Sequence, residues 1–137
     1  MTTTPMVEAN GARIPSLGLG TWTLRDSACS DAVQRALQAG YRHIDTAAMY
    51  GNEEAVGTGL KASGLARDQI FVTTKVWHSD LAPDDLRRST EASLTRLSLS
   101  HVDLLLIHWP NSDIPLVETL TALNLSLIHI SEPTRRS

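Results

Sequence analysis

Cysteine, aromatic side chains and long apolar runs are all scarce in this sequence. Cys29 is the only cysteine, which excludes an internal disulfide and a cysteine-based zinc cluster and is typical of a reducing compartment. No apolar run approaches the ~18 residues that a membrane-spanning helix needs, and residues 1–5 have neither the basic nor the apolar segment of a secretion signal. We therefore expect a cytoplasmic protein with no membrane partner.

Positive and negative side chains are nearly balanced. The formal net charge is −3 and the pI is about 5.9, so a general electrostatic attraction to nucleic acid is excluded. Hydrophobic residues make up 42% of the 137 residues, which is enough apolar material for the core of one domain.

Strand and helix patterns alternate after a predicted N-terminal hairpin. Asn10 and Gly11, between residues 6–9 and 12–15, suit the positive φ angles of a type I′ turn. Asn52 is expected to cap the second helix and Pro83 to begin the third. The expected strands are residues 17–22, 41–46, 70–75 and 102–108, the last apolar enough for burial on both faces, and the expected helices are 30–39, 52–64, 83–97 and 114–124. This order predicts a parallel sheet covered by helices, either a doubly wound sheet or a (β/α)8 barrel.

Three apolar runs each end in a chemically capable residue. Asp45, Lys75 and His108 lie 30 and 33 residues apart, about one strand–helix unit each. Because parallel α/β folds build their sites at the carboxyl ends of strands, we expect these side chains to meet. Tyr50 follows Asp45 by five residues and can fold back to the same edge.

Each of these residues has a structural interpretation when taken alone. Asp45 could cap a turn, Lys75 could reach into solvent, and His108 and Tyr50 could be packing residues. Their equivalent positions in consecutive units favour a common site over four independent accidents.

Four motifs in the right order carry a family resemblance. They are GTW (20–22), GYRHIDTAAMYGNEE (40–54), FVTTKVW (71–77) and VDLLLIHWP (102–110). Together they resemble the aldo-keto reductase superfamily, and in particular its prokaryotic 2,5-diketo-D-gluconate reductase-like branch. The resemblance implies a (β/α)8 TIM barrel closed at the bottom by a hairpin, of which residues 1–124 supply the hairpin and about the first four βα units.

The resemblance also implies NADPH as cofactor, bound without a Rossmann domain. In agreement, Gly18 and Gly20 lack a third glycine at a helix start, and Gly57 and Gly59 lie inside an expected helix. The implied activity is reduction of a small aldehyde or ketone to an alcohol by hydride transfer. The parent enzyme is expected to be a monomer.

The family's catalytic tetrad corresponds to Asp45, Tyr50, Lys75 and His108. Tyr50 would donate the proton, Lys75 would stabilise the phenolate, Asp45 would hold Lys75, and His108 would orient the carbonyl oxygen. No residue is assigned to a metal. The residues implied for cofactor binding are Gly20, Thr21, Trp22 and Asp45, and those for the substrate pocket are Trp22, Trp77, His108 and Trp109. Core packing is the alternative role of the tryptophans.

The end of the sequence departs from the family pattern. A fifth strand at Leu125 would begin only 17 residues after His108. Residues 125–135 resemble the in-frame translation of a sequencing-library adapter, so we expect 125–137 to be non-native. Half a barrel exposes two sheet edges; we therefore expect the chain as written to fold poorly and to bind no NADPH measurably.

Two alternatives stay open. A metal-dependent barrel hydrolase could use His43, Asp45 and His108, although no His-x-His pair is present and Tyr50 and Lys75 would be unexplained. A non-catalytic relative, such as a channel-associated β subunit, would keep the fold without the activity.

Overall fold

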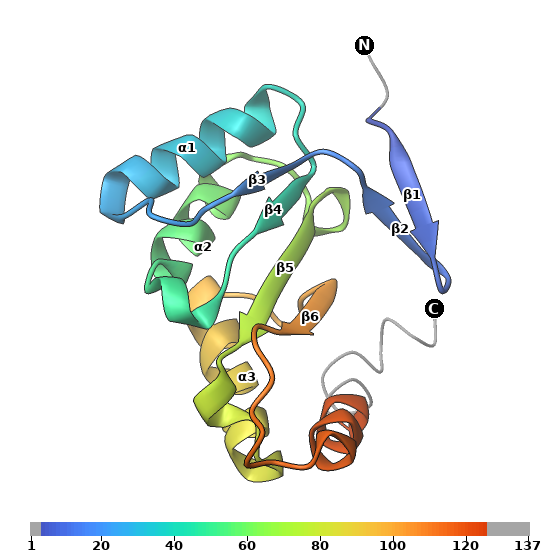
Figure 1. Ribbon diagram of the computed structural model, residues 1–137. Coiled ribbons are helices and arrows are strands. Elements are labelled where there is room, and N and C mark those ends of the chain that lie inside the picture. The colour runs from blue at the N-terminus through green and yellow to red at the C-terminus, as the bar shows by residue number, and fades with distance from the viewer. Residues whose placement is uncertain (1–3, 126–137) are drawn as a thin grey trace.

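The computed structural model describes residues 4–125 of the chain (Figure 1). It begins with an antiparallel hairpin of β1 (Met6–Ala9) and β2 (Ala12–Pro15). Asn10 and Gly11 have φ angles of 51° and 85°, as the predicted turn requires. Of the segment expected to be non-native, residues 126–137 lie outside the described residues.

A four-stranded parallel sheet follows, with its strands in chain order. Figure 1 shows the three helices between these strands along one side of the sheet. A doubly wound sheet would reverse its strand order and carry helices on both faces, so the sequential order favours the barrel. The strands are β3 (Gly18–Gly20), β4 (His43–Asp45), β5 (Phe71–Val76) and β6 (Leu104–Ile107), and the helices are α1 (Asp26–Gln38), α2 (Glu53–Ala62) and α3 (Pro83–Leu97).

Two glycines explain how α2 packs between its neighbours. A Cβ atom at Gly57 would lie 2.5 Å from the carbonyl oxygen of Leu97, and one at Gly59 would lie 2.6 Å from that of Ser30. Glycine normally weakens a helix, so its presence here reflects the close approach of α2 to α3 and to α1.

The core follows the helical periodicity of the sequence. Val33 and Leu37 of α1 are buried as predicted and pack with Val56 of α2 and Val72 of β5. Cys29 lies in the same cluster, and burial raises the pKa of its thiol. No helix among the described residues is long and apolar enough to cross a membrane.

The structure corrects several expected boundaries. The strands β3, β4 and β6 are shorter than predicted, β5 is shifted by one residue at the same length, and α1 begins at Asp26 rather than near residue 30. The prediction that the strand at 102–108 is buried on both faces is wrong: β6 is the edge of the described sheet, and Leu106 is 39% exposed. The predicted fourth helix is confirmed over residues 116–125.

Candidate active site

Lys75 lies near the carboxyl end of β5 and contacts two of the other predicted site residues, Asp45 and Tyr50. Its Nζ donates to Asp45 Oδ1 at 2.6 Å, to the Thr46 carbonyl oxygen at 2.9 Å and to the Tyr50 hydroxyl at 3.4 Å. The Lys75 side chain is only 14% exposed. All three ammonium hydrogens therefore have an acceptor, which fixes the position of the ammonium group.

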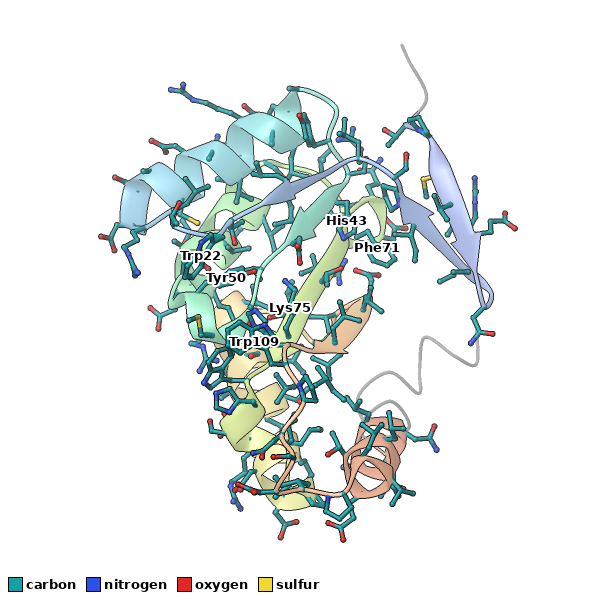
Figure 2. All side chains as sticks on the ribbon, in the orientation of Figure 1. Trp22, His43, Tyr50, Phe71, Lys75 and Trp109 are labelled. Carbon is teal, nitrogen blue, oxygen red and sulfur yellow. The ribbon has the colours of Figure 1, made fainter. Side chains whose placement is uncertain are left out.

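Tyr50 reaches the same edge of the sheet through a short turn. It ends the 3-10 helix η1 (Ala48–Tyr50), and Gly51 follows in the left-handed conformation with φ 69°. The Tyr50 ring lies 5.0 Å from that of Trp22 and 5.7 Å, edge to face, from that of His108. Figure 2 shows Tyr50, Lys75, Trp22 and Trp109 gathered away from His43 and Phe71, which lie toward the hairpin.

His108 follows β6 and is held by a backbone hydrogen bond to the Val76 carbonyl oxygen at 3.0 Å. Burial, and then the Lys75 charge, hold the pKa of His108 below its ordinary 6.5, while Asp45 opposes the shift. Nδ1 is buried and has no hydrogen-bond partner among residues 4–125. The lowered pKa favours the neutral ring, and a proton on Nε2 rather than on Nδ1 leaves no buried N–H without an acceptor.

Three tryptophans continue this surface. Trp77 lies 5.2 Å from both His108 and Trp109, ring centroid to ring centroid. Trp22 is 54% exposed and Trp109 is 59% exposed. Within the described part of the chain neither of these two is a core residue, so their surface is open to a ligand.

The residues expected to bind a cofactor divide into two groups. A Cβ atom at Gly20 would meet nothing within 4 Å, and the Asp45 carboxylate is 40% exposed. Thr21, by contrast, is fully buried, and both its backbone N–H and its hydroxyl donate to the Asp45 carbonyl oxygen. The side chain of Thr21 thus supports Asp45 and offers no surface to a ligand.

His43 does not join Asp45 and His108. Its Nδ1 lies 3.1 Å from the Pro15 carbonyl oxygen and its Nε2 lies 2.8 Å from Thr73 Oγ1. Residues 4–125 contain no group of three or more His, Cys, Asp or Glu side chains that could hold a metal ion. The ligand set of the hydrolase alternative is therefore not assembled here.

Sequence reasoning missed two residues that border the site. Asn52 was expected to cap α2, but its side chain makes no capping hydrogen bond; it is buried and bonds to neighbouring loops instead. Glu53 was expected only as first-turn acid and is 1% exposed. The sequence signal for them was their place two and three residues after Tyr50 in the GYRHIDTAAMYGNEE motif.

Comparison with known proteins agrees with this geometry. The sequence model of the Aldo/keto reductase family matches residues 16–125, so the chain belongs to this family. Methylglyoxal reductase DkgA of Yersinia pestis is 47% identical over 112 residues, which cover 81% of this chain and 40% of that protein. The chain thus spans about 40% of the length of such curated relatives.

Solved structures extend the likeness to the fold. An aldo-keto reductase of Bombyx mori in complex with NADP has a TM-score of 0.84 at 37% identity, covering 93% of this chain and 48% of that one. A putative 2,5-diketo-D-gluconic acid reductase B has a TM-score of 0.83 at 43% identity, covering 91% and 44%. The described sheet and helices are therefore part of a TIM barrel, and the likeness includes the predicted branch.

Proposed function

We propose that residues 1–124 form the N-terminal half of an NADPH-dependent reductase of small aldehydes and ketones, and that they contain its proton-donating machinery. The observation that carries this proposal is the contact of one ammonium group, Lys75 Nζ, with both Asp45 and the Tyr50 hydroxyl. The activity belongs to the full-length protein of which these residues are part.

Tyr50 is the proton donor in this proposal. Reduction of a carbonyl places negative charge on its oxygen, and a positioned O–H neutralises that charge by transferring its proton. The Lys75 ammonium, 3.4 Å from the hydroxyl, stabilises the phenolate that remains. Asp45, at 2.6 Å from the same ammonium, keeps it charged and directed.

His108 orients the substrate. Because its ring is neutral, it donates a hydrogen bond from Nε2 to the carbonyl oxygen without competing with Tyr50 as the acid. The exposed faces of Trp22 and Trp109 would exclude water from the carbonyl and accommodate its apolar substituents.

The open surface around Gly20, Trp22 and the exposed edge of Asp45 fits the nicotinamide end of a cofactor. When bound there, NADPH would supply the hydride that the carbonyl carbon receives. The NADP complex of the Bombyx mori relative supports this choice of cofactor, and the methylglyoxal reductase from Yersinia pestis supports small dicarbonyls as first test substrates.

The test is Tyr50→Phe in the full-length protein, assayed by NADPH oxidation with methylglyoxal. Loss of the hydroxyl should reduce turnover at least ~10²-fold while the dissociation constant for NADPH stays within about twofold. Tyr41→Phe, in the α1–β4 connection, is the matched control and should leave turnover unchanged. Near-normal turnover in Tyr50→Phe would sink the assigned role, and an inactive wild type that binds NADPH would favour the non-catalytic relative.

A further inference from the structure

The 3-10 helix that carries Tyr50 is not anchored by a buried residue of its own. Its three residues, Ala48–Tyr50, include none that is buried, and Met49 is 43% exposed. Gly51 then turns the chain in the left-handed conformation. Because short segments without buried residues are easily displaced, the position of the Tyr50 hydroxyl depends on residues next to this helix in the chain as well as on the contacts of Tyr50 with Lys75, Trp22 and His108.

Asn52, two residues after Tyr50, has every hydrogen-bonding group of its amide engaged except one lone pair. Its side-chain Nδ2 donates to the carbonyl oxygens of Thr21 at 2.8 Å and Leu24 at 3.0 Å, and its Oδ1 accepts from Thr46 Oγ1 at 2.9 Å. Carbonyl oxygens only accept, so the amide orientation is fixed. Asn52 is 3% exposed, and water does not substitute readily for these bonds.

Two of the three partners of Asn52, Thr21 and Thr46, also bond to Asp45 or Lys75. Thr21 donates twice to the Asp45 carbonyl oxygen, and the Thr46 carbonyl oxygen accepts from Lys75 Nζ. A single side chain therefore ties the Tyr50 segment to both sides of the Asp45–Lys75 pair.

Glu53 anchors the same segment from the opposite direction. Its Oε2 accepts from Thr74 Oγ1 at 2.7 Å, next to Lys75 in β5. Its Oε1 accepts from Ser93 Oγ at 3.1 Å and from Arg96 at 2.9 and 2.7 Å, all on α3. The carboxylate is buried and satisfied on both oxygens, as a structural anchor requires.

We propose that Asn52 is a positioning residue that fixes the separation between the Tyr50 hydroxyl and the Lys75 ammonium, with Glu53 as the second anchor. This inference rests on the proposed function, because the separation matters only if Tyr50 gives its proton beside Lys75. Asn52 touches neither reacting group itself and acts through Thr21 and Thr46.

Asn52→Asp in the full-length reductase tests this with almost no change of shape. The new carboxylate oxygen faces the Thr21 and Leu24 carbonyl oxygens, loses both donated hydrogen bonds and repels them. A displacement of about 1 Å costs ~10²-fold in rate, so the single-turnover rate of hydride transfer should fall ~10²-fold while the dissociation constant for NADPH stays within about threefold. Thr46→Val removes one bond of the same set and should show a smaller loss in the same direction.

Ser63→Ala is the matched control at the other end of α2. It removes two hydrogen bonds, to Leu60 and from Leu65, and should lower the melting temperature without slowing hydride transfer. An Asn52→Asp rate within about threefold of the wild type would overturn the inference. So would equal rate losses in Asn52→Asp and Ser63→Ala.

An inactive wild type would refute the proposed function but not the positioning role of Asn52. A second measurement tests that role without using the activity. In protein labelled with [13Cζ]tyrosine, Tyr50→Phe assigns the Tyr50 resonance. That resonance reports the nearby ammonium charge and should shift in Asn52→Asp and stay in place in Ser63→Ala. An unchanged Tyr50 resonance in the folded Asn52→Asp or Thr46→Val variant would overturn the inference.

Discussion

Removing the Lys75 charge gives a direct test of the electrostatic argument. Lys75→Met keeps most of the side-chain volume and removes the ammonium that lies 3.4 Å from the Tyr50 hydroxyl. The fold should tolerate the change, since Asp45 is 40% exposed and water can replace its lost partner. The rate of proton transfer, by contrast, should fall.

The magnitude follows from the distance. Coulomb's law with an effective dielectric constant of about 20 gives about 5 kcal/mol for two full charges at 3.4 Å. Asp45 offsets part of the Lys75 charge, and only part of the phenolate charge exists in the transition state. We therefore expect about half of that energy, about 2.5 kcal/mol, or a reaction slower by somewhat less than ~10²-fold.

The assay is single-turnover NADPH oxidation by the full-length protein, because product release limits steady-state turnover in many enzymes. Arg87→Met is the control: it removes a cation on α3 that is 58% exposed and that, among the described residues, pairs with Glu91 alone. A Lys75→Met rate within about threefold of the wild type, with the Arg87→Met rate unchanged, would refute the role of the ammonium.

Three further predictions concern stability of the same protein. Glu53→Gln removes the buried partner of Arg96 and should lower the free energy of unfolding by about 3 kcal/mol in a urea titration. Gly57→Ala should lower it by about 1–3 kcal/mol, although alanine favours a helix, because its Cβ would lie 2.5 Å from the Leu97 carbonyl oxygen. Folding lowers the pKa of His108 from its ordinary value of 6.5. Between pH 6.5 and the folded pKa, the unfolded chain therefore binds more protons at this residue than the folded chain does. Stability contributed by the neutral ring should be lost as pH falls from 6.5 toward the folded pKa, and His108→Gln should reduce this dependence.

A control at an exposed position separates these effects from a non-specific loss of stability. Glu91→Gln breaks an exposed ion pair and should change the free energy of unfolding by less than about 1 kcal/mol. A stabilised Gly57→Ala variant would contradict the close approach of α2 and α3. A pH dependence of unfolding that is identical in the wild type and in His108→Gln would contradict the lowered pKa.

The sequence predicted the element order and the meeting of the tetrad because both depend on local periodicity. Strand spacing places Asp45, Lys75 and His108 at successive carboxyl ends, and parallel pairing then brings those ends together. The exposure of β6 could not be predicted in this way. An apolar run shows that both faces of a strand can be buried. Whether they are buried depends on which strands and helices lie beside it in the fold.

Asn52 shows where local rules fail for a different reason. Its position before two acidic residues satisfies the usual requirements of a helix cap, yet its amide bonds to loops 6, 28 and 31 residues away in sequence. An asparagine has the same capacity for hydrogen bonds in both roles, so the choice depends on which unpaired groups lie nearby in the folded chain. The Oδ1 atom that a cap would use accepts a hydrogen bond from the Thr46 hydroxyl instead, and the Nδ2 atom donates to the Thr21 and Leu24 carbonyl oxygens. Asn52 is 3% exposed, so water does not readily replace these bonds. The same competition leaves Asn52 next to the Tyr50 segment with its orientation fixed, which is why a residue that local rules treat as a cap can set the geometry of proton transfer.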